Sequence, residues 1–298
     1  MSSMGTLVKE LRGKTGAGIL DCQNALKETD SDIEKAIDLL RQRGLAAAQK
    51  KAGRETKEGV VSSYIHAGSK IGVLVEVNCE TDFVAKDENF QGFSSQLADT
   101  LLEQPGATAD SAGELPLNNT GTQTVEDTRQ QLVTKLGENI SIRRFARLNK
   151  TAGGTLGIYL HGIRIGVIVD LSTDNPGLAK DLAMHIAASN PLCVNEEDVA
   201  PQVLENERQI QLAQARQSGK PDEIVEKMVS GRIKKFLREN TLTGQAFVKD
   251  PDTSVAALLK ANNASVNGFI RYEVGEGIEK KVDNFAAEVM QQAGLTNE

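Results

Sequence analysis

Two parts of the chain, about 95 positions apart, repeat the same order of residues, and this repeat limits the possible folds more than any other feature. In the first copy, SYIH (residues 63–66) is followed by IGVLVEV (residues 71–77). In the second copy, IYLH (residues 158–161) is followed by IGVIVDL (residues 165–171). Apolar, β-branched runs separated by a short glycine-containing segment are typical of a β-hairpin. The repeat therefore predicts two hairpins of the same kind.

Each predicted hairpin is followed by a segment of helical character, residues 89–102 and 178–189. A later helix and strand, residues 253–261 and 269–274, are expected to rejoin the second unit. The simplest account is an α+β fold with duplicated core subdomains, each of which places helices on a small antiparallel sheet. Residues 103–124 contain Gly, Pro and Asn between these units, and we expect them to form a loop.

Residues 5–48 are expected to form three short helices that pack as a small bundle. The run TGAG (residues 15–18) separates the first two helices, because glycine accepts backbone angles that other residues resist. Ser31 and Glu34 have the spacing of a capping box at the start of the third helix. The basic run KKAGR (residues 50–54) is expected to be a solvent-exposed connector. Helical spacing predicts a buried face made of Leu7, Val8, Leu11, Ile19, Cys22, Ala25, Leu26, Ile33, Ala36, Ile37 and Leu40.

Residues 196–239 have only helical character, with one narrow apolar stripe and a break at SGKP (residues 218–221). A short break between two such helices favours an antiparallel helical hairpin. The pattern alone is equally consistent with an arm that projects and with a pair that lies flat on the body. A last helix is expected from about Asp283 to Gln292. The domains that we predict are 1–54, 55–148, 149–282 with the helical hairpin included, and 283–298.

The composition excludes several classes of protein. A net charge of −7 argues against a general nucleic-acid surface, which needs a basic field. Aromatic residues make up only 4% of the chain and Trp is absent, so platforms for stacking bases are scarce. No apolar run approaches the roughly 20 residues of a membrane span, and the first residues lack the apolar core of a signal peptide. Three scattered cysteines do not form a disulfide framework, and we expect a cytoplasmic protein.

Motifs for nucleotides, metals and catalysis fail on inspection. Gly13-Lys14-Thr15 lacks the first glycine of a phosphate-binding loop and follows a helix instead of a strand. His66, His161 and His185 do not have metal-ligand spacing, and no cysteine pair completes a zinc set. His66 and His161 occupy equivalent positions in the repeat, where a turn histidine bonded to the backbone is the simplest interpretation. We therefore expect no cofactor, no bound metal or nucleotide, and no enzymatic activity.

The run EVNCETDFVAK (residues 76–86) ends the second strand of the first hairpin and places Phe83 beside Asp82. Burial of a Phe gains roughly 1.5–3 kcal/mol, so local chemistry favours a Phe83 that packs inward. Thr81 or Asp82 would then cap the next helix. The alternative is a Phe83 that remains at the tip as a wedge for another protein.

Several segments together resemble the elongation factor Ts family, the guanine-nucleotide exchange factors of bacterial translation. They are LRGKTGAGILDCQNAL (11–26), GLAAAQKKAGR (44–54), EVNCETDFVAK (76–86), HGIRIGV (161–167), AMHIAAS (183–189) and FIRYEVGEGIEK (269–280). The resemblance covers nearly the whole chain. One departure is Gln23, where the family more often has a basic residue, which puts a contact from that position in doubt. Residues 103–124 are the least similar part.

The resemblance implies a ubiquitin-associated-like fold for the N-terminal bundle and a protruding helical hairpin. It also implies that the partner is the GTPase elongation factor Tu, whose GDP release the chain would promote. The run of Thr81, Asp82, Phe83 and Val84 would dislodge the partner's magnesium, with Phe83 in an apolar gap between helices and Asp82 stabilising the shifted arrangement.

The other residues that the resemblance assigns to partner binding are Lys9, Arg12, Ile19, Leu20, His161 and Phe269. Ile19 and Leu20 also fit the core pattern, so we expect only one of them to be wholly exposed. A homodimer and a 2:2 complex with the partner are both left open, as is the role of the helical hairpin. Two other classes remain as alternatives. One is a binding scaffold for a different target, which would keep Phe83 buried. The other is a small-molecule enzyme, for which no residue constellation is visible.

Overall fold

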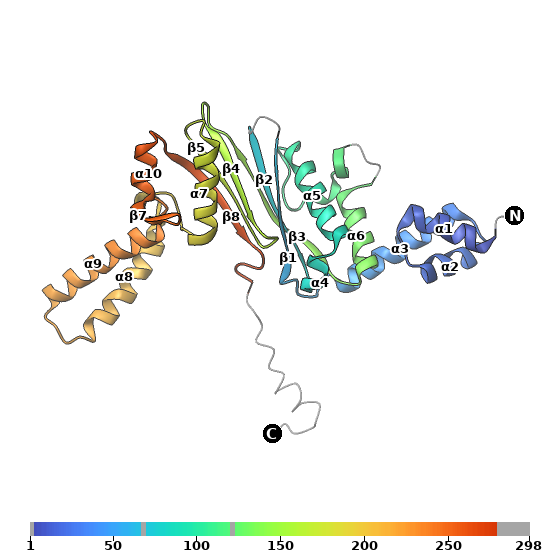
Figure 1. Ribbon diagram of the computed structural model, residues 1–298. Coiled ribbons are helices and arrows are strands. Elements are labelled where there is room, and N and C mark those ends of the chain that lie inside the picture. Colours follow the sequence, from blue (N-terminus) through green and yellow to red (C-terminus); the bar gives the residue numbers. More distant parts are fainter. Residues whose placement is uncertain (1–2, 67–69, 120–122, 279–298) are drawn as a thin grey trace, which may run out of the picture.

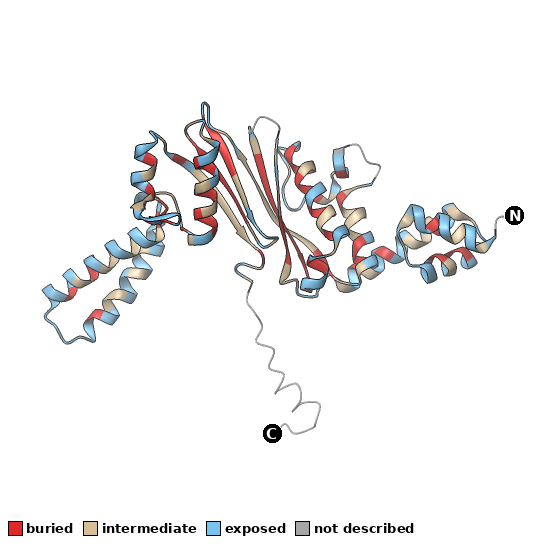
Figure 2. Cartoon of the chain, viewed as in Figure 1, coloured by how far each residue is buried: buried red, intermediate tan, exposed pale blue. Residues whose placement is uncertain are grey.

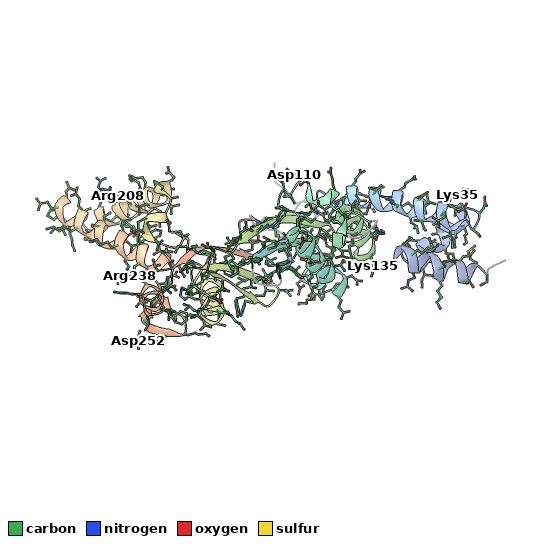
Figure 3. The ribbon with its side chains drawn as sticks, turned by 90° about the horizontal axis from the view of Figure 1, so that it is seen from above. Lys35, Asp110, Lys135, Arg208, Arg238 and Asp252 are labelled. Carbon is green, nitrogen blue, oxygen red and sulfur yellow. The ribbon has the colours of Figure 1, made fainter. Side chains whose placement is uncertain are left out.

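The computed structural model describes residues 3–66, 70–119 and 123–278. The predicted helix from 283 to 292, and with it the module 283–298, lies outside the described residues. The chain forms an elongated molecule with a helical bundle at one end, a two-sheet core in the middle and a pair of helices at the other end (Figure 1). Figure 3 shows the same order from above, with Lys35 in the bundle and Arg208 at the opposite end.

The N-terminal bundle consists of α1 (Met4–Thr15), α2 (Ile19–Glu28) and α3 (Ile33–Lys51). Its core is made of Leu11, Cys22, Ala25, Leu26 and Ala36, as the helical spacing predicts. The prediction of a capping box formed by Ser31 and Glu34 is wrong. Asp32 is the N-cap of α3 and accepts a hydrogen bond from the Lys35 N–H at 3.1 Å, whereas Ser31 adopts a left-handed backbone with φ of 66°.

Helix α3 is longer than expected and enters the core. Lys50 and Lys51 belong to its last turn, so the prediction of a basic connector is wrong for these two residues. Ala48 is buried in the core of the first subdomain, and the Lys51 ammonium donates to the Val133 carbonyl at 3.4 Å. Packing against the core extends the helix, because tertiary contacts stabilise the helical conformation of its last turns.

The core contains two three-stranded antiparallel sheets with related strand orders, β1-β2-β3 and β4-β5-β8. Both predicted hairpins are present, β1 with β2 and β4 with β5, and the predicted strand near the end of the described chain pairs with β5. The α+β class is therefore confirmed. The strands are β1 (Glu58–Ile65), β2 (Ile71–Cys79), β3 (Ile140–Asn149), β4 (Thr155–His161), β5 (Ile165–Leu171) and β8 (Val266–Glu273).

The repeat continues into the third strand of each sheet, where the equivalent residues are 124 positions apart instead of about 95. Val73 lies opposite Arg147 in the first sheet, and the equivalent Val167 lies opposite Arg271 in the second. Two positions along the strands, the partners are Phe145 and Phe269, which both pack on the core of their own subdomain. The register thus identifies β3 and β8 as equivalent strands.

The two sheets face each other and carry their helices on the outer sides (Figures 1 and 2). Val61, Leu74 and Ile168 belong to the apolar cluster between the sheets. The sheets approach closely at two equivalent glycines. A Cβ at Gly166 would lie 2.6 Å from Val61 Cγ1, and one at Gly72 would lie 3.1 Å from Ile168 Cδ1. The helices on the outer faces are α5 (Glu88–Leu102) and α6 (Val125–Leu136) on the first sheet and α7 (Pro176–Ser189) on the second.

Residues 103–124 contain little regular structure in their described part, as expected. Two short 3₁₀ helices, Ala112–Glu114 and Leu117–Asn119, lie there, and Ala112 and Leu117 are buried against the core. Helix α6 follows directly and was not predicted. Its start carries a capping box in which Thr124 and Asp127 bond each other's backbone, at 3.1 and 3.2 Å.

The predicted helical hairpin is formed by α8 (Pro201–Arg216) and α9 (Asp222–Asn240) and projects from the second subdomain (Figure 1). The alternative of a pair lying flat on the body is therefore wrong. Its narrow seam buries Ala215, Val225 and Val229. Elements near the hairpin are a 3₁₀ helix Glu196–Asp198, the unpredicted strands β6 (Ala246–Phe247) and β7 (Asp250–Ser254), and α10 (Val255–Ala261). Among the described residues, no helix combines the length and the hydrophobicity that a membrane span requires.

Candidate functional site

Phe83 lies on α4 (Asp82–Ala85), a single helical turn that Glu80 and Thr81 separate from the end of β2. Its side chain is 81% exposed, so the inward packing that local chemistry favours is wrong. The capping part of that interpretation is right, because the Thr81 hydroxyl is the N-cap and accepts from the Val84 N–H at 3.4 Å. The turn thus has a regular start and presents an uncovered aromatic ring.

The exposure of Phe83 follows from which residues of the turn face the core. Val84 and Ala85 are buried in the core of the first subdomain. Successive helical residues point about 100° apart, so the residue before this buried pair faces outward. Val84, which the resemblance assigns to the partner-binding run, thus anchors the turn from below and contributes little surface of its own.

Asp82 is also exposed and forms an ion pair with Lys86, with 2.6 Å between Oδ2 and Nζ. The hydrogen bond from Lys86 is the main cause that lowers the pKa of Asp82 below its usual value. The wedge residues, by which we mean Asp82 and Phe83, therefore offer a fully ionised carboxylate beside an apolar ring at neutral pH.

Cys79, which is buried beneath α4, has a structural role. Burial, with smaller contributions from Glu138 and Glu58, raises the pKa of the Cys79 thiol to about 12. The thiol remains protonated and donates to the Thr81 carbonyl, with 3.2 Å between Sγ and O. Cys79 therefore supports the wedge residues and does not act as a nucleophile, which requires a thiolate.

Thr81 is held by a residue that the sequence analysis did not identify. Its hydroxyl donates to Glu138 Oε1 at 2.6 Å, and its backbone N–H donates to Glu138 Oε2 at 3.0 Å. Glu138 lies between α6 and β3, 57 positions further along the chain. No local pattern marks a contact of this separation, so only the tertiary structure reveals it.

The turn that carries His161 lies at the same end of the core as α4. Arg164 in this turn pairs with Glu58 at 2.6 Å, and Glu58 lies opposite Cys79 at the end of β2. His161 is exposed, and its Nδ1 lies 3.0 Å from the Tyr159 hydroxyl, so its ring is bonded to a side chain and not to the backbone as expected. The structure thus brings His161 and the wedge residues to one edge of the molecule.

The predicted contact residues of the N-terminal bundle form a second, separate surface. Lys9 and Arg12 are exposed on α1. Ile19 and Leu20 at the start of α2 are 57% and 72% exposed, so the expectation that only one is uncovered is wrong. The bundle is too small to cover Ile19, although its spacing fits the buried face. A pair of adjacent uncovered aliphatic side chains remains there.

Phe269 and His185 are not at either surface. Phe269 is half-buried on β8 and packs against the core of the second subdomain. His185 is buried on α7, where its Nε2 lies 3.0 Å from Gln245 Oε1 and its Nδ1 accepts from the Val248 N–H at 3.2 Å. Burial lowers the pKa of His185, so this ring is neutral. Both residues stabilise the fold.

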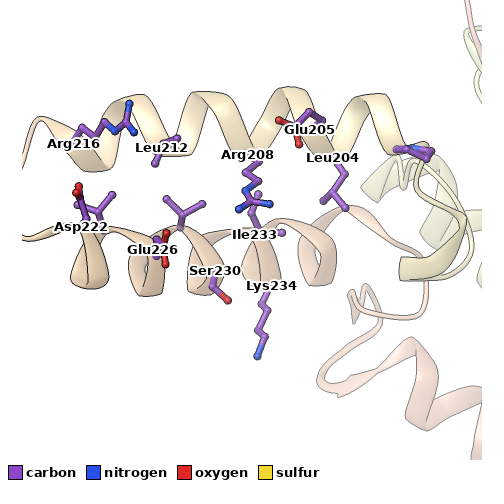
Figure 4. Close-up of a pocket in the computed structure, with 13 residues that line it drawn as sticks. Leu204, Glu205, Arg208, Leu212, Arg216, Asp222, Glu226, Ser230, Ile233 and Lys234 are labelled. Carbon is purple, nitrogen blue, oxygen red and sulfur yellow. The ribbon is translucent and has the colours of Figure 1, made fainter.

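A groove with a volume of about 820 Å³ runs between α8 and α9. Apolar side chains such as Leu204 and Leu212 face the other helix, and Lys234 points away from it (Figure 4). Within the described ranges, no cluster of three or more His, Cys, Asp or Glu residues could hold a metal ion. The groove is the open seam of a helical hairpin and brings no catalytic set together.

Comparison with known protein sequences identifies the family of the chain. The sequence model of the family "Elongation factor TS" matches residues 80–276. The chain is 55% identical to elongation factor Ts of Thioalkalivibrio sulfidiphilus over 293 residues, which cover 98% of this chain and 99% of the relative. It is 54% identical to elongation factor Ts of Nitrosospira multiformis over 290 residues, with coverage of 97% and 95%. Elongation factor Ts of Legionella pneumophila (strain Paris) is 49% identical over 286 residues, with coverage of 96% and 97%. A match of this length and identity shows that the chain belongs to the elongation factor Ts family.

Proposed function

We propose that this protein binds the GDP form of elongation factor Tu and accelerates GDP release during translation elongation by displacing the bound magnesium. The observation that carries the proposal is the exposure of Phe83 beside an ionised Asp82 on a turn anchored in the core. An exposed Phe lacks roughly 1.5–3 kcal/mol of stabilisation that burial would provide, and burial in an apolar gap of a partner would contribute this free energy to binding. The exposed ring also supports this proposal over the binding-scaffold alternative, for which we expect Phe83 to be buried.

The mechanism is reciprocal linkage between two ligands of one GTPase. A protein that binds the nucleotide-free partner more tightly than the GDP form must weaken GDP binding by the same factor. Magnesium requires near-ideal octahedral geometry and tolerates little displacement of its ligands. Phe83 would enter a gap between partner helices and Asp82 would stabilise the shifted helices, so that the metal site distorts. No covalent bond in this chain is made or broken.

Two further contacts would hold the partner in place. Lys9, Arg12, Ile19 and Leu20 would grip its nucleotide-binding domain from the N-terminal bundle. The turn of His161 would contact the same domain beside the wedge residues, because it lies at the same edge of the core. Phe269 and Val84 would act indirectly, since their side chains pack inside the protein. The reaction takes place where bacterial translation does, in the cytoplasm.

Stopped-flow release of a fluorescent GDP analogue from elongation factor Tu, at fixed magnesium, tests the proposal. We expect a large acceleration by the wild-type protein and its loss in Phe83→Ala and Asp82→Ala. Leu192→Ala is the matched control, because Leu192 is also an exposed hydrophobic residue, at 55%, but lies outside both surfaces. If the wild type gives no acceleration, the proposed function is refuted.

A further inference from the structure

Helix α4 is too short to define its own position. It contains four residues, whereas isolated helices shorter than roughly 12 residues are marginal in water. The direction in which Phe83 points therefore depends on contacts made by the residues that flank the turn. On the side of the preceding strand, three of these contacts converge on the carboxylate of Glu138.

The carboxylate of Glu138 holds both the backbone and the cap of α4. Its Oε2 accepts from the N–H groups of Glu80 at 3.1 Å and Thr81 at 3.0 Å. Its Oε1 accepts a hydrogen bond from the Thr81 hydroxyl at 2.6 Å. Because the Thr81 hydroxyl donates its hydrogen to Glu138, its oxygen lone pair is oriented to accept a hydrogen bond from the Val84 N–H at 3.4 Å. Hydrogen bonds to an ionised acceptor are about twice as strong as neutral ones.

The contact is reciprocal, and it reaches the helix that leads to the N-terminal bundle. Glu80 Oε1 accepts from the Asn139 N–H at 2.6 Å, so each loop supplies a carboxylate to the other. The Asn139 amide donates to the carbonyls of Ala52 at 3.3 Å and Arg54 at 2.9 Å, just after α3 ends. We call the set of Glu80, Thr81, Glu138 and Asn139 the Glu138 clasp.

We propose that Glu138 is a positioning residue for nucleotide exchange, which holds the wedge residues in the direction they need through Thr81 without touching the partner. The inference rests on the proposed function. Geometric requirements of this kind can be strict: in enzymes, a misplacement of about 1 Å by a mutation far from the chemistry can cost about 100-fold in rate. A clasp that fixes the turn before binding also lowers the ordering cost of binding.

Glu138→Gln tests the proposal with minimal change in volume. The amide retains one oxygen for the backbone N–H groups, but its nitrogen cannot accept the Thr81 proton. We expect the maximal rate of GDP release, at saturating exchange factor, to fall about tenfold. We expect the Kd for nucleotide-free elongation factor Tu, measured by titration, to stay within about threefold. Glu126→Gln is the matched control, because Glu126 also bonds through both oxygens, to Arg129 on its own helix α6.

A second variant tests the same contact from its other side if Glu138→Gln is unstable. Thr81→Val has a shape similar to threonine but no hydroxyl to donate to Glu138, so its rate of GDP release should fall as in Glu138→Gln. Thermal unfolding of each variant verifies the fold.

The outcomes separate the clasp from the wedge. If Phe83→Ala is slow while Glu138→Gln and Thr81→Val keep the wild-type rate, the positioning role is refuted and the proposed function stands. If rate and affinity fall by the same factor in Glu138→Gln, Glu138 is a structural residue and the inference is also refuted. If the wild type itself does not accelerate GDP release, the proposed function fails first.

Discussion

The close approach of the two sheets predicts a graded cost for adding one methyl group at their glycines. A Cβ at Gly166 would meet Val61 Cγ1 at 2.6 Å, Leu74 Cδ2 at 3.0 Å and Leu160 Cδ2 at 3.1 Å. Insertion of a methyl into a packed core costs typically 1–3 kcal/mol. The replacement of Gly by Ala returns about 0.4–1 kcal/mol by restricting the unfolded chain. Gly166→Ala should therefore lower the free energy of unfolding by about 1–2 kcal/mol.

Other glycines bracket this value. At Gly72 the nearest atom to a Cβ is Ile168 Cδ1 at 3.1 Å, the end of a flexible side chain, so Gly72→Ala should be nearly neutral. At Gly157 a Cβ would lie 2.4 Å from the Ala179 backbone of α7, which cannot rotate away, so this variant should be the least stable of the series. Gly92→Ala in α5 meets nothing within 4 Å and should gain roughly 0.5–1 kcal/mol.

Urea denaturation followed by circular dichroism measures the series, with unchanged slopes showing that only stability differs. The expected order of stability is Gly92→Ala, Gly72→Ala, Gly166→Ala and Gly157→Ala, from highest to lowest. A Gly166→Ala variant as stable as the wild type would refute the claim that the sheets are packed to contact at this position. So would a Gly72→Ala variant less stable than Gly166→Ala.

Three further predictions concern charged groups. Glu76 is fully buried and accepts from Arg143, Arg144 and the Gly275 N–H, so Glu76→Gln should destabilise the protein by about 3–5 kcal/mol in urea denaturation. Burial acts to raise the pKa of Glu76, but the hydrogen bonds from these donors outweigh it, so the pKa of Glu76 is lowered. The stability that this shift contributes is fully present above the usual pKa of 4.5 and should be lost as the pH falls below 4.5. Acid unfolding measures this loss. Burial lowers the pKa of His185, so the unfolded chain takes up a proton at a higher pH than the folded protein, and stability should fall as the pH drops below 6.5. In His185→Gln, the urea midpoint should not show this pH dependence between pH 5.5 and 7.5. Lys86→Ala removes an exposed ion pair to Asp82 and should change the GDP release rate by no more than about fivefold, and a larger loss would mean that Lys86 itself contacts the partner.

The parts of the fold that the sequence predicts are those with strong local patterns. Both hairpins, the helices that follow them and the helical hairpin are marked by apolar runs of fixed period. Strand β3 lacks such a pattern, because its adjacent Arg143 and Arg144 both turn toward the buried Glu76 across the sheet. Helix α6 did carry a local signal, the capping pair of Thr124 and Asp127, and could have been predicted from it.

The candidate site likewise has one part that could be predicted from the sequence and one part that could not. Its exposed tip was found through the resemblance, but local chemistry alone placed Phe83 inside, since a typical Phe gains by burial. The opposite outcome depends on Val84 and Ala85, which take the only inward-facing positions of a four-residue turn. Glu138 could not be inferred, because its contacts to Thr81 join segments 57 positions apart and follow no period.

Helix α3 has a consequence for how firmly the wedge residues need to bind. Its 19 residues span about 28 Å, and the ion pair between Arg41 and Asp127 fastens it to α6, so it acts as a stiff spacer between the bundle surface and the core. Under the proposed function, a partner held by the bundle would meet Phe83 as a tethered ligand, whose effective concentration is highest when the length of the linker matches the distance to be spanned. The contact of Phe83 can then be individually weak and still be occupied, and a weak contact is one that an incoming nucleotide can displace quickly.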